Sequence, residues 1–585
     1  MENATKPKLV FFQFKHDQTL REFILLHRQQ HIKCLLEFFD VTVINEDCDY
    51  EEVCDRYQPD LALFESGVNY KSIHRLDIKN TSAYPKIPKL GLHNGDSWCE
   101  ARSGFLSDME CWGIETFFSI CTTTAEYTPE IAENLFVWPN FIDPDIYKDY
   151  HQPKNIPVLM TGYSHSLYPW RQNITKIITS HYPSLICPHP TYVKDSGTPR
   201  GIYGEQYART INASWFVPSC GTIAREVVRK HLEIPASKSC LLTEKTASIE
   251  AAGFIDMQNC VFADGTNVLD KLDYLFQNLD ELEKIIDAGY KLVHSRHTLK
   301  HRDQILQWFK LYKNLQEDQK IIQSNPFEPL CIVGKLSDSQ NKHIICDGLI
   351  LDLLRRGDEK LWAGKYEEAE ALYFQCNVHI SWMPEPKLRL ALCYLYRGDP
   401  AQALDWIWQP IRYTLEEYRA KEPDPVEWAY YIIILLCQGN LDAANQHCQQ
   451  FPSLNHPELE RTRLAIEILR NEKNQHSSQI NCKLKVRYSV HQLPDRSFSE
   501  WIDRLCLMLG ASGQFNFSKK LKKSVFTEDK DFSRINFLTQ QLKLDLASRR
   551  YRLSEFIKSN LKTFIRQTSI RKTLVYLEKL SRNSV

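Results

Sequence analysis

Three short clusters combine residue types that could bind or activate a charged, oxygen-rich ligand. In the first, a strand-like run ends at Gly162 and leads into a helix that bears Arg171. A strand that ends in glycine lets the backbone approach a ligand, and an arginine near a helix start adds donors to the positive end of the helix. This arrangement suits a pyrophosphate. Since G-x-G-x-x-G is absent, an ordinary ion pair of Arg171 with a surface carboxylate stays open.

The second cluster places Lys230 and Glu233 three residues apart, hence on one face of a predicted helix. The carboxylate could accept hydrogen bonds from both hydroxyls of a ribose while the cation meets a phosphate. Taken alone, the pair reads equally as an exposed i,i+3 ion pair. Glu250 follows in Glu250-Ala251-Ala252-Gly253-Phe254.

The third cluster follows a short apolar run and contains His93 and Asp96 in a glycine-bearing loop. Transfer to a hydroxyl requires a base for the acceptor proton or neutralisation of a departing phosphate. We predict Asp96 as the base and His93 as a substrate or phosphate contact, with Glu65 as a weaker candidate base. The alternative is an Asx turn beside a core histidine.

The elements around these clusters alternate short apolar runs with helix-like stretches, which predicts doubly wound parallel sheets. A polar, proline-bearing stretch at 143–157 interrupts the alternation. We therefore predict two Rossmann-like domains, an acceptor-side domain at 1–150 and a nucleotide-binding domain at 151–318, with the ligand in the cleft between them.

Helical patterns dominate after about residue 350. The pattern L-x-x-G-x-x-x-x-A occurs three times, with its glycines at Gly364, Gly398 and Gly439. The first interval is 34 residues, the period of a tetratricopeptide repeat (TPR). We predict an all-α TPR-like repeat module at 345–475, with an ordinary helical bundle as the alternative.

Composition sets further limits. The 585 residues exceed one core, and neither a long apolar run nor a signal-peptide order occurs, so we expect a cytoplasmic protein. The 18 cysteines show no metal-ligand spacing, and we predict no metal site.

The net charge of −1 hides a basic end, because residues 501–585 contain 18 basic and 7 acidic residues. We predict a basic helical region at 476–585 that contacts an anionic membrane surface or the acidic remainder, or is merely solvated; no motif suggests nucleic acid.

The order of these features over about the first 315 residues resembles the group 1 glycosyltransferases of the GT-B fold, most closely the CgeB-type branch. Five segments carry the resemblance, the last running on to Arg302: Val137–Tyr147, Gly162–Arg171, Arg229–Ala236, Glu250–Phe254 and Ala288–Thr298. The resemblance implies the GT-B fold, transfer of a sugar from a nucleotide-sugar co-substrate to a hydroxyl acceptor, and no metal or other cofactor.

The resemblance also implies roles for named residues. Arg171 and Lys230 would contact the donor diphosphate, Glu233 its ribose or sugar hydroxyls, and Glu250 the donor sugar. The predicted donor-binding set is completed by Gly162, Tyr163, Tyr168 and Arg229. Many relatives carry two glutamates separated by seven residues, but here the first position is Arg225, so that glutamate is missing or displaced to Glu226.

Two functional hypotheses follow. The first is an active transferase, whose repeat module would serve a protein, peptide or cell-surface glycan acceptor. The second is a TPR-type scaffold with a degenerate, non-catalytic transferase domain, which the missing glutamate would explain.

Overall fold

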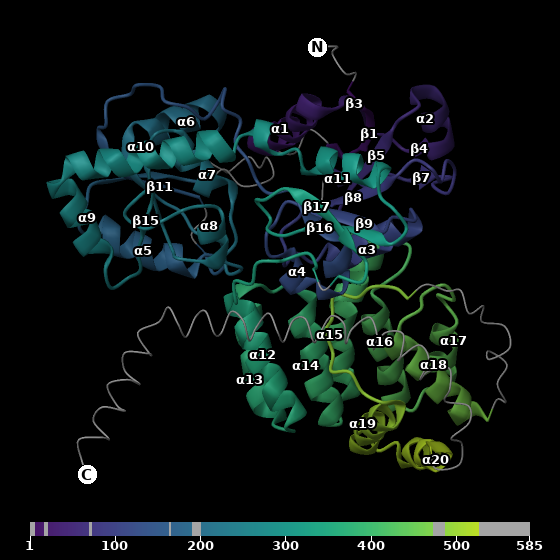
Figure 1. Ribbon diagram of the computed structural model, residues 1–585. Helices are drawn as coiled ribbons and strands as arrows, with labels where there is room; N and C mark the ends of the chain where they lie inside the picture. The colour runs from purple at the N-terminus through teal and green to yellow at the C-terminus, as the bar shows by residue number, and fades with distance from the viewer. Residues whose placement is uncertain are drawn as a thin grey trace, which may run out of the picture. The chain divides into compact units, whose positions relative to one another are not determined.

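The computed structural model describes residues 6–16, 21–68, 73–162, 165–189, 201–337, 339–471 and 486–525. The chain divides into two compact units. The first comprises residues 1–434 and 487–493, and the second comprises residues 435–486 and 494–585. Both large sheets belong to the first unit (Figure 1).

The first sheet has six parallel strands in the order β10-β9-β8-β5-β1-β3. Its strands are β1 (Lys8–Phe12), β3 (Asp40–Ile44), β5 (Leu61–Ser66), β8 (Lys89–His93), β9 (Thr116–Ser119) and β10 (Leu135–Val137). Its helical elements are α1 (Glu22–Phe38), α2 (Tyr50–Tyr57), α3 (Arg102–Cys111), α4 (Thr124–Tyr127) and η1 (Pro129–Asn134). Short apolar runs of the sequence thus form the strands, as the alternation predicts.

Helices cover both faces of this sheet. Because successive side chains of a strand point to opposite faces, each strand contributes to the core on either side. In β1, Leu9 and Phe11 pack in the core under α1, whereas Val10 and Phe12 pack in the core formed with α2 and α3. The sequence therefore reads as a continuous apolar run, and the predicted doubly wound sheet is confirmed.

The second sheet repeats this architecture with five parallel strands in the order β12-β11-β13-β14-β15. Helices α6 and α7 cover one face, and α5 and α9 cover the other. Its strands are β11 (Ile156–Thr161), β12 (Ser184–Cys187), β13 (Ser214–Pro218), β14 (Cys240–Thr243) and β15 (Val261–Phe262). Its helices are α5 (Pro169–Thr179), α6 (Gly204–Asn212), α7 (Arg229–Ala236), α8 (Ala247–Ala251), α9 (Val268–Gln277) and α10 (Leu279–Arg296).

In each sheet the strand order reverses beside the first strand. The reversal lies between β1 and β5 in the first sheet and between β11 and β13 in the second. In open parallel sheets of this kind, ligands bind beyond the carboxyl ends of the strands at such a switch point. The loops that follow β5, β8, β11 and β13 are therefore the places to seek a site.

After the second sheet the chain returns to the first. The short helix η2 (Leu299–His301) and α11 (Gln304–Lys313) contribute Leu299, Ile305 and Trp308 to the core beneath the first sheet. The hairpin β16–β17 (Gln319–Gln323 and Leu330–Gly334) joins the same core. The structure thus differs from the predicted division at residue 318, because the amphipathic α11 buries its apolar face against the first sheet. Two further two-stranded pairings are β2–β6 (Lys15–His16 with Ile73–His74) and β4–β7 (Cys48–Asp49 with Ile78–Lys79).

Paired helices follow in the first unit. Gly364 and Gly398 adopt φ of +77° and +78°, a conformation that favours glycine, in the turns within two such pairs. These turns fall where the repeat pattern predicts them, while the identification as TPR repeats stays a prediction. The elements are α12 (Leu349–Trp362), α13 (Tyr366–His379), α14 (Pro384–Tyr396), α15 (Pro400–Arg412), the π-helical turn η3 (Tyr413–Glu417) and α16 (Pro425–Cys437).

The second unit contains the end of α16 and further helices. Gly439, with φ of +78°, forms the turn before the first of them. They are α17 (Leu441–Cys448), α18 (Pro457–Arg470), α19 (Phe498–Ala511) and α20 (Phe515–Val525). The predicted basic helices beyond residue 525 lie outside the described residues. No helix within the described ranges is long and apolar enough to cross a membrane.

Candidate active site

Gly162 lies directly after β11 and faces two cations. A Cβ placed on Gly162 would come within 2.3 Å of Lys230 Nζ and 2.8 Å of Arg171 Nη1, and its φ of +93° favours glycine. The close approach explains why the strand must end in this residue type. The structure therefore brings together Gly162, Arg171 and Lys230, which come from two separate sequence clusters.

Local contacts hold these cations in place. Arg171 is buried at the start of α5, where its guanidinium lies 4.4 Å from the ring centroid of Tyr168. Lys230 Nζ donates to Thr161 Oγ1 at 3.1 Å. Burial and the neighbouring Arg171 lower the pKa of Lys230 to about 7. Two cations held side by side at partial desolvation form a site that a dianionic group would neutralise.

Glu233 occupies the inner face of α7. It is 3% exposed and pairs with Arg229, whose Nε lies 3.5 Å from Glu233 Oε1. The ion partner is thus Arg229, one turn back, and not Lys230, which the alternative of an i,i+3 ion pair required. Arg229 Nη2 also donates to Gln30 Oε1 of α1, so this arginine joins the two sheet domains. Among the described residues, Glu233 Oε1 is buried without a hydrogen-bond donor.

Residues 224–228 do not form the helix that the sequence predicts. Arg225 has φ of +57°, and the Glu226 amide donates to Gly221 O at 3.1 Å, which turns the chain back on itself. A Cβ on Gly221 would lie 2.2 Å from Glu226 O, so the turn requires glycine. Because of this loop, α7 begins only at Arg229 and the Glu226 side chain is free to point away from it.

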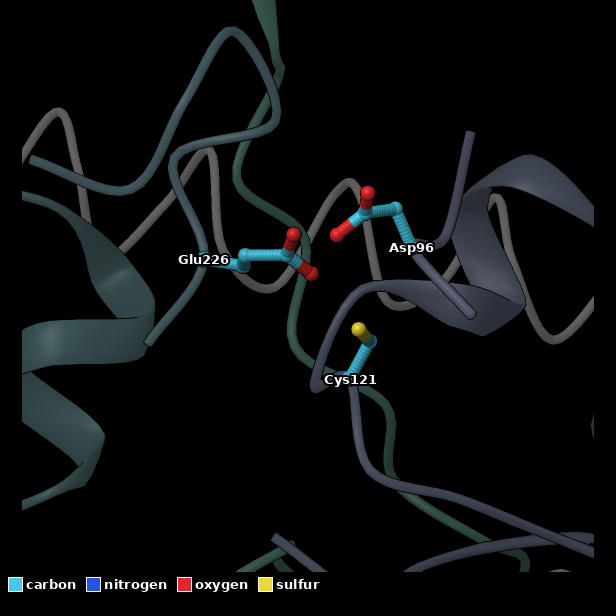
Figure 2. A group of neighbouring side chains, drawn as sticks. All are labelled: Asp96, Cys121 and Glu226. Carbon is cyan, nitrogen blue, oxygen red and sulfur yellow. The ribbon is translucent and has the colours of Figure 1, made fainter. Parts of the chain in front are cut away.

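Glu226 meets Asp96 and Cys121 from the other sheet domain. Figure 2 shows the two carboxyl groups facing each other with the Cys121 sulfur beside them. One ligand atom from each residue lies within 4.8 Å of the others. Thr123 Oγ1 donates to Glu226 Oε2 at 3.0 Å, and Ser97 Oγ donates to the same oxygen at 3.4 Å.

The two carboxyl groups differ in their proton affinity. Asp96 is solvent-exposed as a residue, yet enough protein surrounds its carboxyl group to raise the pKa to about 6. Glu226 is 1% exposed, and burial together with the charge of Asp96 raises its pKa to about 8. At neutral pH, Asp96 is therefore ionised while Glu226 keeps its proton. Such a pair can accept a proton on one side and donate a hydrogen bond on the other.

Asp96, Cys121 and Glu226 are also the donor set that could hold a metal ion among the described residues. A thiol and two carboxyl groups suit a borderline ion such as Zn²⁺. However, burial raises the pKa of the Cys121 thiol well above its ordinary value, and Cys121 Sγ donates to Gly95 O at 3.5 Å. The protonated thiol and protonated Glu226 fit a hydrogen-bonded cluster.

His93 lies behind the loop that carries Asp96. It is 1% exposed, packs edge-on against Phe105, and has its Nε2 3.7 Å from Cys99 Sγ. Burial lowers its pKa to about 3, so the imidazole is neutral. The burial agrees with the alternative of a core histidine: His93 supports the loop from within, and its role as a substrate contact stays a prediction.

Two further candidates lie in other surroundings. Glu65 is buried, paired with Arg28 and accepting from Asn94, which ties it to a structural network. Glu250 is exposed on α8 and pairs with Lys245 at 3.2 Å. Tyr163 lies outside the described residues. The sugar-contact role of Glu250 stays a prediction.

Glu244 was not among the predicted site residues. It follows β14, accepts from the Gly221 amide at 3.2 Å, and burial raises its pKa even though Arg225 and Arg171 lie near enough to lower it. The sequence signal that could have indicated Glu244 is its position directly after the strand that ends at Thr243. It braces the same loop that projects Glu226.

Residues 173–307 match the family described as glycosyl transferase-like. The matched stretch contains Glu226, Lys230 and Glu233. Over this stretch the chain is similar to that family, and two parallel α/β sheets stand in series along the chain. No curated protein matches the sequence significantly.

Solved structures with similar chains include three that extend over 53% of this chain. Sucrose-phosphate synthase from Thermosynechococcus elongatus is 8% identical with a TM-score of 0.39, and 99% of its chain is covered. A glycosyltransferase from Rickettsia africae is 13% identical with a TM-score of 0.35 and full coverage. Anabaena HepE, solved with UDP and glucose, is 10% identical with a TM-score of 0.34 and full coverage.

Proposed function

We propose that the protein transfers a sugar from a nucleoside diphosphate sugar to a hydroxyl acceptor without a bound metal. The observation that carries this proposal is the convergence of Lys230 Nζ and Arg171 Nη1 on Gly162, where a Cβ would lie 2.3 and 2.8 Å from them. The site adjoins the N-terminus of α5, which has no side-chain cap and presents a positive dipole end. A diphosphate fits this combination of charges.

Neighbouring side chains would bind the ribose of the donor. Glu233 Oε1, buried without a donor among the described residues, would accept from a ribose hydroxyl. A buried carboxylate oxygen gains most from a ligand hydroxyl because leaving it unpaired is costly. Arg229, whose Nε lies 3.5 Å from this oxygen, orients the carboxylate.

The chemical step would use the facing carboxyl groups. Ionised Asp96 takes the proton of the acceptor hydroxyl while the hydroxyl oxygen bonds to the anomeric carbon of the donor sugar. The bond from that carbon to the phosphate oxygen breaks, and the leaving diphosphate keeps the electron pair. Arg171, Lys230 and the α5 N-terminus stabilise the developing charge, which is the task a metal serves elsewhere. Protonated Glu226 donates a hydrogen bond beside the reacting atoms.

Donor binding is tested by thermal shift of the full chain with nucleoside diphosphates and their sugars. We expect a stabilising shift that Arg171→Ala abolishes. The matched control is Arg209→Ala on α6, whose arginine forms an exposed pair with Glu205 in the same domain. The proposal would be contradicted if no nucleotide shifted the melting temperature, or if Arg209→Ala lost the shift equally. Either result would favour a non-catalytic scaffold.

The acceptor is proposed to be a protein, a peptide or a cell-surface glycan, presented by TPR-like repeats. The glycine turns at 364 and 398, 34 residues apart, and the further glycine turn at 439 support that module. The test is mass spectrometry of candidate acceptors incubated with the donor that gives the largest thermal shift. An added sugar residue is expected on a peptide or glycan; product formed only by hydrolysis of the donor would count against such an acceptor.

A cytoplasmic location with peripheral contact to the inner face of the membrane is proposed from charge alone. Residues 501–585 carry a net charge of +11, and a basic segment gains about 1 kcal/mol per cation near an anionic surface. Co-sedimentation with phosphatidylserine vesicles should fall when the chain ends at residue 525. Equal sedimentation of both chains would remove this part of the proposal.

A further inference from the structure

The segment Gly95–Arg102, here called the Asp96 loop, packs against helices that follow the transferase domains. All of these contacts lie within the first compact unit. Cys99 and Ala101 of the loop form a buried apolar cluster with Tyr413, Tyr418 and Ala420. The predicted base thus sits on a loop whose inner side is covered by residues more than 300 positions further along the chain.

Tyr418 makes the most specific of these contacts. Its hydroxyl lies 2.7 Å from Ser66 Oγ, donates to Asp108 Oδ2 at 2.8 Å, and accepts from the Gly67 amide at 3.1 Å. The ring lies over α3 so closely that a Cβ on Gly104 would be 2.3 Å from its Cδ1. A glycine is therefore required in the first turn of α3 to admit the tyrosine.

An irregular stretch of backbone delivers this side chain. The α15 helix passes into the π-helical turn η3, and Arg419 then adopts φ of +64°. The Ala420 amide donates to Thr414 O at 2.9 Å, which closes the turn around Tyr418. Such departures from regular helix are costly and persist when surrounding contacts fix them.

Gly67 transmits this contact to the Asp96 loop. A Cβ on Gly95 would lie 2.3 Å from Gly67 O, so the two glycines touch through their backbones. The Asn94 amide donates to Ser66 O at 3.4 Å. Because this layer is close-packed, a shift at Ser66 or Gly67 displaces the residues that precede Asp96.

The other end of the loop is anchored to the same helices. Trp98 lies 6.2 Å from the ring of Trp382, and Arg102 Nη2 donates to Glu385 Oε2 of α14 at 2.8 Å. The Arg102 guanidinium also donates to Cys99 O and Tyr127 O. The loop is thereby fixed on both sides of Asp96 by residues from the helical region.

We propose that Tyr418 is a positioning residue for Asp96, and that helix α14 with the turn η3 forms part of the active-site structure. This inference rests on the proposed function for its kinetic consequence. A loop held from behind keeps the Asp96 carboxyl in register with Glu226, and misplacement of a reacting group by about 1 Å can cost on the order of 100-fold in rate.

The test is Tyr418→Phe in the full chain, which keeps the ring and removes the hydroxyl. We expect kcat to fall about tenfold or more while KM for the donor stays unchanged, because the donor contacts belong to the other sheet. Amide hydrogen exchange in residues 94–101 should accelerate. Gly104→Ala, which pushes the ring from its place, should produce the same pattern.

Tyr413→Phe is the matched control, since Tyr413 packs in the same cluster without the three hydroxyl contacts of Tyr418. Wild-type kcat and wild-type exchange in Tyr418→Phe would overturn the proposal, as would equal effects in Tyr413→Phe. If exchange accelerates in Tyr418→Phe but neither this variant nor the wild type transfers a sugar, the positioning role stands and the proposed function fails.

Discussion

Asp96 and Glu226, 130 positions apart and supported by different sheets, bring their carboxyl groups within 4.8 Å of each other. Each comes from a loop beyond the carboxyl ends of parallel strands, the place where such folds carry their ligands. Burial raises the pKa of both groups, and the charge of Asp96 raises that of Glu226 further. The two carboxyl groups therefore titrate as a coupled pair, and the site requires residues from both sheet domains.

Replacing Asp96 with asparagine should remove the base and leave donor binding intact. The amide keeps the size of the side chain, but it cannot accept a proton from the acceptor hydroxyl. We expect kcat to fall about 100-fold or more, in line with general base catalysis. Steady-state kinetics measures the loss, and thermal shift with the donor checks that binding is preserved.

The paired variant Asp49→Asn serves as a control, because Asp49 caps α2 far along the chain from the cluster. Wild-type turnover in Asp96→Asn would show that another group accepts the proton.

The pH profile of kcat at saturating donor should rise through about pH 6 and fall above about pH 8. The rise follows ionisation of Asp96, whose raised pKa makes it a base only above that value, and the fall follows loss of the Glu226 proton. Glu226→Gln stays neutral at every pH, so the fall should disappear while the rise persists. A wild-type profile that is flat from pH 5 to 9 is incompatible with this assignment.

Sequence reasoning located the sheets because the apolar runs are short, regular and buried on both faces. Leu61–Ser66 and Cys240–Thr243 lie where their β-rich composition predicts, bounded by turn residues. These strand positions follow from local pattern. The resemblance to group 1 glycosyltransferases assigned Arg171 and Lys230 to one diphosphate, and the structure brings both side chains against Gly162.

Features that depend on tertiary contacts were not predicted. The run through Arg225 and Glu226 has helical composition, yet Gly221 turns the chain back and holds these residues in a loop. For His93 the sequence left a substrate contact and a core histidine open, and only its contacts with Phe105 and Cys99 favour the core. No periodicity indicates that Tyr418 should reach Ser66, because that contact joins residues 352 positions apart.

Donor binding should be accompanied by proton uptake. Lys230 has a pKa of about 7 in the free protein and is therefore mostly neutral at pH 8. A bound diphosphate favours the charged ammonium and raises that pKa, so close to one proton should be taken up at pH 8. Affinity should fall by up to about tenfold per pH unit above 7. Calorimetric titration in buffers of different ionisation enthalpy measures the uptake.

Lys230→Arg provides the comparison for that titration, since arginine stays charged throughout this range. Its binding should show little pH dependence and no proton uptake. Equal uptake in wild type and Lys230→Arg would assign the proton to another group.

The buried ion pair between Arg102 and Glu385 should matter more for stability than the exposed pairs of the same unit. Both side chains are at most 6% exposed, so Arg102→Met leaves the Glu385 carboxylate without its cation. Breaking such a pair costs about 3–5 kcal/mol, whereas replacing both partners by apolar groups costs far less. Arg355, 64% exposed beside Asp352, should contribute about 0–1 kcal/mol.

Calorimetry compares the melting temperatures of Arg102→Met, the double variant Arg102→Met/Glu385→Leu and Arg355→Met. The single change at Arg102 should lower the melting temperature most, with the double variant closer to wild type; an equal effect of Arg355→Met would mean that burial does not set the strength of the pair.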